Sequence, residues 1–193
     1  MTQALSDAAT LSEVAKPDNS VRRTRLREFQ AQLVDRMQAA QRGGFTQLSQ
    51  LGVLIGGVHY LLDLREAGEI VSVGTLTEVP LTRDWYKGVS NIRGNLTSVV
   101  DLPRFQGSEP TPLDASCRIV GFASVLAFNG GLLVSQVLGL RNVAEMEVVV
   151  NEPGAADGRA WLPRSFRDSE GRIWHELSLA ALVQDQDFLH IGL

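Results

Sequence analysis

Short segments in which apolar and polar residues alternate dominate the chain from residue 51 onward. Val58, Tyr60, Leu62 and Leu64 fall on one face of an extended segment, because side chains alternate along a strand. Further segments with a strand-like apolar character are 51–55, 69–73, 89–92, 96–102, 118–128 and 132–137. A series of short strands separated by turn residues predicts a mainly β protein.

A helical pattern precedes the strands. Residues 21–44 predict an N-terminal helix, because apolar side chains recur at spacings of three and four up to a glycine pair; the stripe consists of Leu26, Phe29, Leu33, Met37 and Ala40. This stripe would either pack on the chain's own domain or dock a partner. The polar residues 1–20 predict a mobile tail. We therefore expect a tail, a helix, a β domain over 45–185 and a C-terminal tail over 186–193.

Glycines recur in a way that indicates an internal repeat. Gly56-Gly57 and Gly130-Gly131 each precede a strand, and Gly94 and Gly171 each form a tight turn before another strand, at nearly equal intervals. Residues 107–114, rich in Gly and Pro, predict a linker near the middle of the β region. The repeat predicts two similar small barrels that share one core, since each alone is too small to be stable.

The charge of the chain narrows the possible partners. Its 193 residues carry a formal net charge of −4, which argues against nucleic-acid binding as the main role. The one dense basic run, residues 22–27, is interpreted as the solvated face of a helix. There is no apolar leader and no apolar run long enough to span a membrane, and Cys117 is the single cysteine. These features predict a cytoplasmic protein that binds no nucleic acid and does not insert into membranes.

Catalytic signatures are missing from the sequence. His59, His175 and His190 are scattered, no metal-binding or phosphate-binding motif occurs, and Cys117 has no histidine near it. We therefore expect no enzyme activity, no catalytic residue, no metal and no cofactor. Two rival hypotheses stay open: a hydrolase in which His59 contacts a serine or an aspartate, and a small RNA-binding barrel with a basic face.

One motif is more specific. Residues 86–102 read Tyr-Lys-Gly-Val-Ser-Asn-Ile-Arg-Gly-Asn-Leu-Thr-Ser-Val-Val-Asp-Leu. This segment resembles the signature of the CheW-like family, in which a Gly-Val-x-Asn-Leu-Arg-Gly core leads into an apolar strand that ends in Asp-Leu. Ile92 replaces the usual leucine. Segments 63–70 and 118–142 are also similar to the family, so the resemblance covers about residues 50–183.

The resemblance implies two five-stranded SH3-like β-barrel subdomains in pseudo-symmetry and a protein without catalytic activity. It implies an adaptor that couples the cytoplasmic tip of a methyl-accepting chemoreceptor to a CheA-type histidine kinase. The N-terminal extension and residues 85–87 and 165–168 are most similar to the twitching-motility branch of the family. Control of type IV pili is therefore expected; the alternative is a general chemotaxis adaptor that controls a flagellar motor.

We expect the receptor-binding site at Glu69, Val71, Asn91, Arg93, Gly94 and Val99. Gly94 would supply the positive φ of a hairpin turn, and Asn91 would bond the local backbone. Arg93 would offer its donors to a partner or would pair with Glu69 of its own chain. Val71 and Val99 would either form the apolar floor of a groove or belong to the core.

Overall fold

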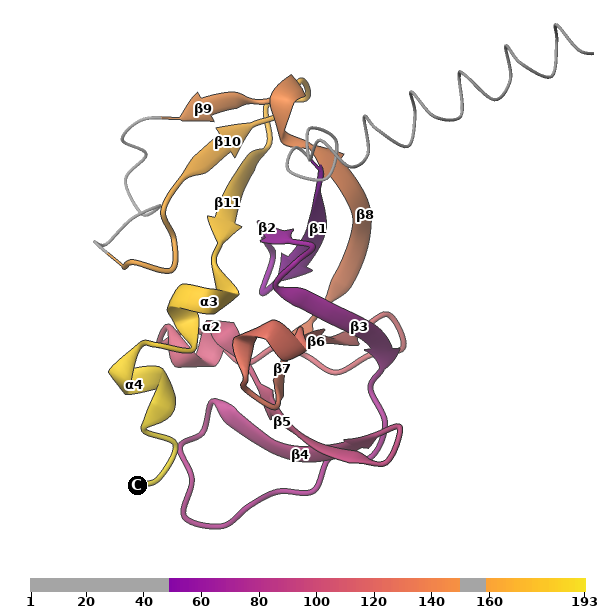
Figure 1. Ribbon diagram of the computed structural model, residues 1–193, viewed down its shortest axis with the longest axis vertical. Coiled ribbons are helices and arrows are strands. Elements are labelled where there is room, and N and C mark those ends of the chain that lie inside the picture. The colour runs from indigo at the N-terminus through magenta and orange to yellow at the C-terminus, as the bar shows by residue number, and fades with distance from the viewer. Residues whose placement is uncertain (1–48, 150–158) are drawn as a thin grey trace, which may run out of the picture. The chain divides into compact units, whose positions relative to one another are not determined.

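The computed structural model describes residues 49–149 and 159–193. The predicted tail over 1–20 and the predicted helix over 21–44 lie outside these residues. Within them the strands form two sheets, which we call sheet A and sheet B (Figure 1). The protein is therefore mainly β, as the alternation of its apolar residues predicts.

Sheet A has six strands, which are β1 (Ser49–Ile55), β2 (Val58–Asp63), β8 (Gln136–Asn142), β9 (Glu147–Val149), β10 (Ser165–Arg167) and β11 (Ile173–Leu177). Its order is β8-β1-β2-β11-β10-β9. Sheet B has five strands, which are β3 (Ala67–Ser72), β4 (Tyr86–Ile92), β5 (Asn95–Val100), β6 (Arg118–Phe122) and β7 (Gly130–Val134). Its order is β3-β6-β7-β5-β4.

Short helical segments connect or follow the strands. They are α2 (Leu102–Phe105), η1 (Ser124–Leu126), η2 (Val143–Glu145), α3 (Leu179–Leu182) and α4 (Gln186–Leu189). The predicted strand over 96–102 ends at Val100 because Pro103 favours the start of α2. The predicted strand over 132–137 is broken at Ser135, where the chain passes from sheet B to sheet A.

Each sheet is built from both halves of the chain, if the chain is divided between β5 and β6. Sheet A joins β1 and β2 to strands of the second half, and sheet B joins β6 and β7 to strands of the first half. In both sheets the second strand of one half pairs in parallel with the last strand of the other half, β2 with β11 and β7 with β5. Apart from β9, the two sheets have the same strand order. The internal repeat is therefore present, and its halves are interlaced.

Both sheets are curled, because side chains from strands far apart in each sheet meet in one apolar cluster. All five strands of sheet B contribute to one cluster, the B cluster, through Val71, Ile92, Val99, Ile119 and Leu133. The two edge strands of a flat five-stranded sheet would lie about 19 Å apart, too far for their side chains to share a cluster. Sheet A surrounds a corresponding A cluster, which contains Leu61, Phe166 and Trp174.

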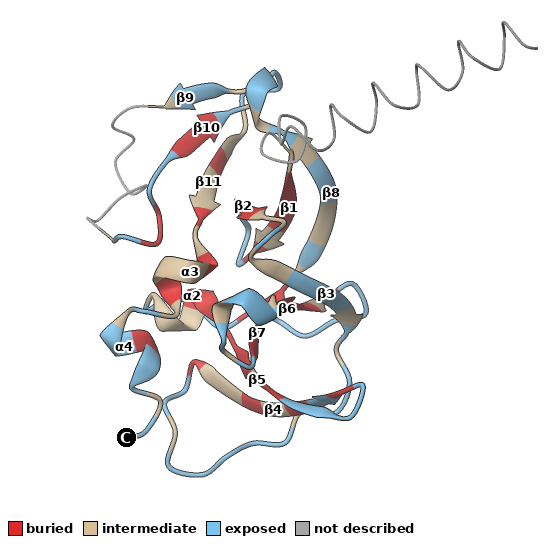
Figure 2. Ribbon diagram, viewed as in Figure 1, coloured by how far each residue is buried: buried red, intermediate tan, exposed pale blue. Residues whose placement is uncertain are grey.

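A third and larger cluster, the central cluster, joins the two sheets. It contains Leu51, Tyr60 and Leu62 of sheet A and Val100, Leu132 and Val134 of sheet B. β7 is consequently buried along its whole length, and β5 is buried at Val99 and Val100 (red in Figure 2). Neither sheet would keep the central cluster buried without the other, since both cover the same apolar side chains.

Residues 186–193 belong to the packed domain rather than to a tail. Phe188 of α4 is 1% exposed and lies in the central cluster, where its ring stacks on Trp85. Gly192 forms a bridge with Thr82, and the amide of Leu193 donates to the carbonyl of Leu81. One buried aromatic residue among polar neighbours is enough to hold this short segment in place.

Asp168 holds the turn that leads into β11. Its carboxylate accepts hydrogen bonds from the amides of Glu170 and Arg172, both at 2.9 Å, and from the indole N–H of Trp174 at 2.9 Å. Partial burial acts to raise the pKa of Asp168, but the bonds from Trp174 and from the two amides outweigh it and lower that pKa. The carboxylate therefore stabilises the turn and the largest side chain of the A cluster together.

We expect Asp168→Ala to lower the free energy of unfolding by about 2–4 kcal/mol at pH 7, because several charge-assisted hydrogen bonds are lost. A carboxyl whose pKa is lower in the folded state stabilises the fold above its unfolded value, near pH 4, and loses this effect as the pH falls. The difference in free energy of unfolding between wild type and Asp168→Ala, measured by urea unfolding, should therefore be smaller at about pH 3 than at pH 7. Asp187→Ala, at an exposed carboxylate, serves as the control; an equal difference at both pH values would contradict this role of the charge.

Candidate functional site

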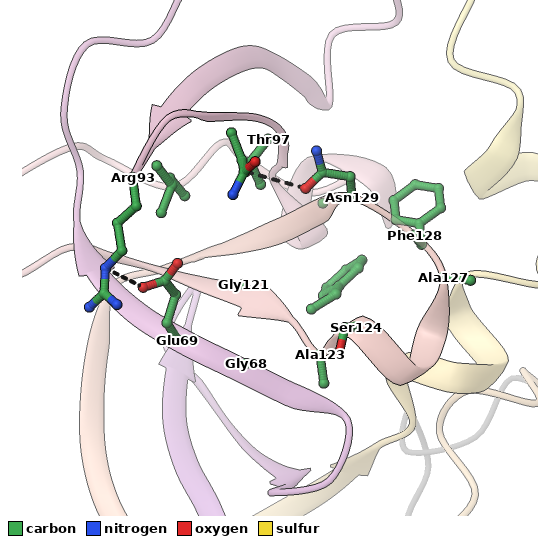
Figure 3. Close-up of a pocket in the computed structure, with 14 residues that line it drawn as sticks. Gly68, Glu69, Arg93, Thr97, Gly121, Ala123, Ser124, Ala127, Phe128 and Asn129 are labelled. Atoms are coloured by element: carbon green, nitrogen blue, oxygen red, sulfur yellow. Dashed lines mark hydrogen bonds and ion pairs between the residues drawn. The ribbon is translucent and has the colours of Figure 1, made fainter.

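A groove of about 590 Å³ opens at one end of the B cluster. Residues of β3, of the β4–β5 hairpin, of β6 and of the connection from β6 to β7 line it. In Figure 3, Glu69 and Arg93 lie on one side of the groove, Ala127, Phe128 and Asn129 lie on the other, and Gly121 lies between them. The volume is within the range of ligand sites, ~300–1,000 Å³.

The tip of the β4–β5 hairpin places a charged side chain at the edge of this groove. Ile92 pairs with Asn95, and the two residues between them have positive φ, 50° at Arg93 and 89° at Gly94. This is the pattern of a type I′ turn, which favours Asn or Asp at the first position. An arginine in the left-handed region costs about 1–2 kcal/mol. The turn is thus less stable with Arg93 than with its preferred residues.

Asn91 and Gly94 complete the turn as the sequence predicts. The side-chain oxygen of Asn91 accepts a hydrogen bond from the amide of Gly94 at 2.8 Å. Both residues are exposed, and neither lines the groove. Their part in the site is to hold Arg93 in position.

Arg93 pairs with Glu69 across the edge of the groove. Its Nε lies 2.9 Å from Oε2 of Glu69, and the two side chains are 80% and 38% exposed. An ion pair this exposed contributes about 0–1 kcal/mol, because water screens it and ordering two long side chains opposes it. Arg93 therefore pairs with Glu69 of its own chain, one of the two predicted alternatives, and most of its side-chain surface is exposed.

The opposite wall is held by polar contacts between β5 and the segment before β7. The hydroxyl of Thr97 donates to the side chain of Asn129 at 3.4 Å, and the amide of Ser98 donates to the carbonyl of Asn129 at 3.2 Å. Ala127 has φ of 50°, a second left-handed non-glycine residue at the groove. Phe128 contributes an aromatic ring that lies 5.7 Å from Phe122, measured between ring centroids.

Val71 and Val99 do not form the floor of the groove. Val99 is 0% exposed and lies in the B cluster, against which the half-buried Val71 packs. Thr97 and Val99 share a face of β5, but Thr97 is nearer the open end and lines the groove, whereas Val99 lies deeper. Of the two alternatives for these valines, the core position fits Val99, and the half-buried Val71 packs against the same cluster.

Several lining residues were not expected from the sequence, namely Thr97, Gly121, Phe122, Phe128, Asn129 and Gly130. Gly121 and Gly130 lie within strands, where glycine often marks close approach of a ligand or a backbone. Gly121 falls inside the predicted strand 118–128, which is the one signal of a site that the sequence offers here. Gly130 is expected to precede a strand but lies within β7.

Histidine contacts in sheet A do not assemble an accessible catalytic group. The hydroxyl of Ser165 lies 2.9 Å from Nδ1 of His175, but Ser165 is buried. The ring of His59 packs on Trp174, with 4.8 Å between centroids, and not on a serine or an aspartate. In the described ranges, no group of His, Cys, Asp and Glu could hold a metal ion, and no helix is long and apolar enough to cross a membrane.

A two-sheet β protein whose open groove carries an arginine at its edge has the features of a binding module. Residues 49–187 match the model of the CheW-like domain, and the chain belongs to this family. The family is one of scaffolding proteins without catalytic activity, so the chain is not an enzyme.

Two individual proteins show the extent of the similarity. Protein PilI of Pseudomonas aeruginosa is 32% identical over 103 residues, which are 53% of this chain and 57% of that protein. The match thus spans little more than half the length of the curated relative. The scaffolding protein TtCheW of Thermoanaerobacter tengcongensis has a similar fold, with a TM-score of 0.55 at 20% identity over 68% of this chain and 88% of that one.

A pair of truncations tests the position of Val99. Val99→Ala should lower the free energy of unfolding by about 2 kcal/mol, because it removes buried methyl groups from the B cluster. Ile70→Ala, on an exposed part of β3, should change it by less than about 0.5 kcal/mol. Urea unfolding measures both, and a neutral Val99→Ala variant would show that this side chain is not a core residue.

Proposed function

We propose that the chain is a cytoplasmic adaptor that couples a methyl-accepting chemoreceptor to a CheA-type histidine kinase in a chemotaxis-like pathway that controls type IV pilus twitching motility. The observation that carries this proposal is the groove of sheet B with Arg93 held at its edge. The similarity to PilI supports the link to pili. In this proposal each curled sheet is an SH3-like barrel.

Glu69 and Arg93 would be the polar contacts of the receptor site. A receptor helix that carries a carboxylate would compete with Glu69 for the guanidinium, and the low net stability of the exposed pair would allow this exchange. Arginine suits this role, because its planar fork bonds carboxylates in two parallel hydrogen bonds. Asn91 and Gly94 would act by fixing the turn.

Exposed aliphatic residues next to the lining residues would add apolar contact area. Ile70 follows Glu69, Leu96 precedes Thr97 and Val125 follows Ser124, and all three are exposed. Protein interfaces combine an apolar centre with a polar rim, and truncation of a few residues accounts for most of the loss of affinity. The receptor tip would therefore occupy the groove, and the kinase would bind another face.

Arg93→Asn separates binding from stability. Asn is favoured at this turn position, so the melting temperature should stay the same or rise slightly. Capture of the purified receptor tip by the immobilised variant should fall at least about tenfold. Arg65→Asn is the matched control, because Arg65 is also exposed and paired with a carboxylate, that of Asp63, outside the groove.

Two results with Arg93→Asn would contradict the proposed role of Arg93. Retention of receptor binding by Arg93→Asn would place the receptor elsewhere. A marked drop in its melting temperature would mean that Arg93 is structural. Co-purification of tagged wild-type protein from the native cell tests the class as a whole, and we expect a multidomain histidine kinase to be recovered.

A further inference from the structure

The equal strand order of the two sheets allows their positions to be compared residue by residue. Trp174 of β11 lies three residues after the turn glycine Gly171, and Thr97 of β5 lies three residues after the turn glycine Gly94. Both glycines have positive φ. Trp174 pairs with His59 of β2, and the neighbouring pair Ser98–Gly130 places Thr97 beside Asn129. Trp174 in sheet A and Thr97 in sheet B are therefore equivalent positions.

In sheet A this position is filled by the protein itself. The side chain of Trp174 is fully buried, the ring of His59 packs on it, and the guanidinium carbon of Arg141 lies 5.1 Å from its ring centroid. Gly52 of β1 leaves space for the indole, since a Cβ at Gly52 would lie 2.9 Å from the Trp174 ring. The end of the A cluster is thus closed by a bulky side chain.

In sheet B the same position is open. Thr97 is much smaller than Trp174, and Asn129 takes the place of His59. Gly121 corresponds to Gly52 by the strand register. Gly52 pairs with Leu61, two residues after His59, and Gly121 pairs with Gly131, two residues after Asn129. A Cβ at Gly121 would meet nothing nearer than the carbonyl oxygen of Glu69 at 3.4 Å, an ordinary contact. The groove therefore lies where the indole lies in sheet A.

The comparison also indicates the polarity of the missing group. The indole N–H of Trp174 donates to Asp168, which lies two residues after Phe166, the partner of Trp174 in the ladder. In sheet B the partner of Thr97 is Ser90, and two residues after Ser90 stands Ile92, which lines the groove. An apolar side chain thus stands where sheet A has the carboxylate that accepts from the indole N–H, so this point of the groove favours an apolar group.

We infer that the groove receives one bulky apolar side chain of the partner, of the phenylalanine, leucine or methionine type, in the place that Trp174 occupies in sheet A. This inference rests on the proposed function, in which the groove is the partner site. It adds the chemistry of the anchor: an apolar side chain between Thr97, Gly121 and Phe128, with the Arg93–Glu69 pair at the rim.

The inference is tested with a small probe that requires no partner protein. N-acetyl-phenylalaninamide, titrated into the full chain labelled with ¹⁵N, should shift the amides of Thr97, Gly121 and Gly130 with a dissociation constant on the order of 1 mM, as expected for so small a ligand. N-acetyl-alaninamide should leave these amides unchanged. The absence of a shift at the groove with the phenylalanine probe would overturn the inference.

Thr97→Trp closes the groove from within, as Trp174 closes sheet A. Thr97→Trp should keep the melting temperature of the wild type and lose the amide shifts caused by the probe. If Thr97→Trp does not fold, Gly121→Val is used in its place. A folded variant that still responds as wild type would overturn the inference.

Two alanine variants compare the two sheet ends directly. Gly121→Ala should melt close to wild type, whereas Gly52→Ala should melt clearly lower, because its Cβ meets the Trp174 ring. An equal loss in both variants would mean that the end of sheet B is closed as well, which also overturns the inference.

The probe titration tests the inference, and the receptor and kinase capture tests the proposed function, so either can fail without the other. If the phenylalanine probe binds but no receptor or kinase is captured, the inference stands and the proposed function fails. If Arg93→Asn loses receptor binding while the probe shifts nothing, the proposed function stands and the apolar anchor is wrong.

Discussion

The parallel pairing of β2 with β11 and of β7 with β5 is the constraint on which the rest of the structure depends. Each pair joins strands from different halves of the chain, so neither sheet exists until most of the chain has folded. Such pairings are made between distant residues and carry a high cost in loop-closure entropy. The central cluster offsets this cost, because both sheets bury the same apolar side chains in it.

The interlaced halves also limit how far the two sheets can move relative to one another. The chain crosses from β2 to β3 through residues 64–66 and from β7 to β8 through Ser135 alone. Glu66 reinforces the first crossing, since its carboxylate accepts from the amide of Leu179 at 2.7 Å and its carbonyl accepts from Ala123. Connections this short join the two sheets directly, without a flexible linker between them.

The sequence was informative where a local rule decides the structure. Alternation identified β2, and the positive φ of Gly94 and the hydrogen bond of Asn91 follow from turn chemistry. It could not show the interlacing, because a period of two says which face a residue is on but not which strand is its neighbour. Thr111, within the predicted linker, is buried and bonded to Asp101, a contact that composition does not reveal.

The site was predicted in part for the same reason. Glu69 and Arg93 line the groove, but Val99 is core, and the wall formed by Phe128 and Asn129 was missed. The sequence pattern makes Gly130-Gly131 equivalent to Gly56-Gly57, yet neither Gly130 nor Gly131 has positive φ, and both lie in β7 with side chains packed closely over them. Whether a glycine forms a turn or makes room depends on what faces it across the sheet. The asymmetry between Trp174 and Thr97 has the same origin. One repeated pattern gives a closed end in sheet A and an open groove in sheet B, and the side chains opposite each glycine distinguish the two ends.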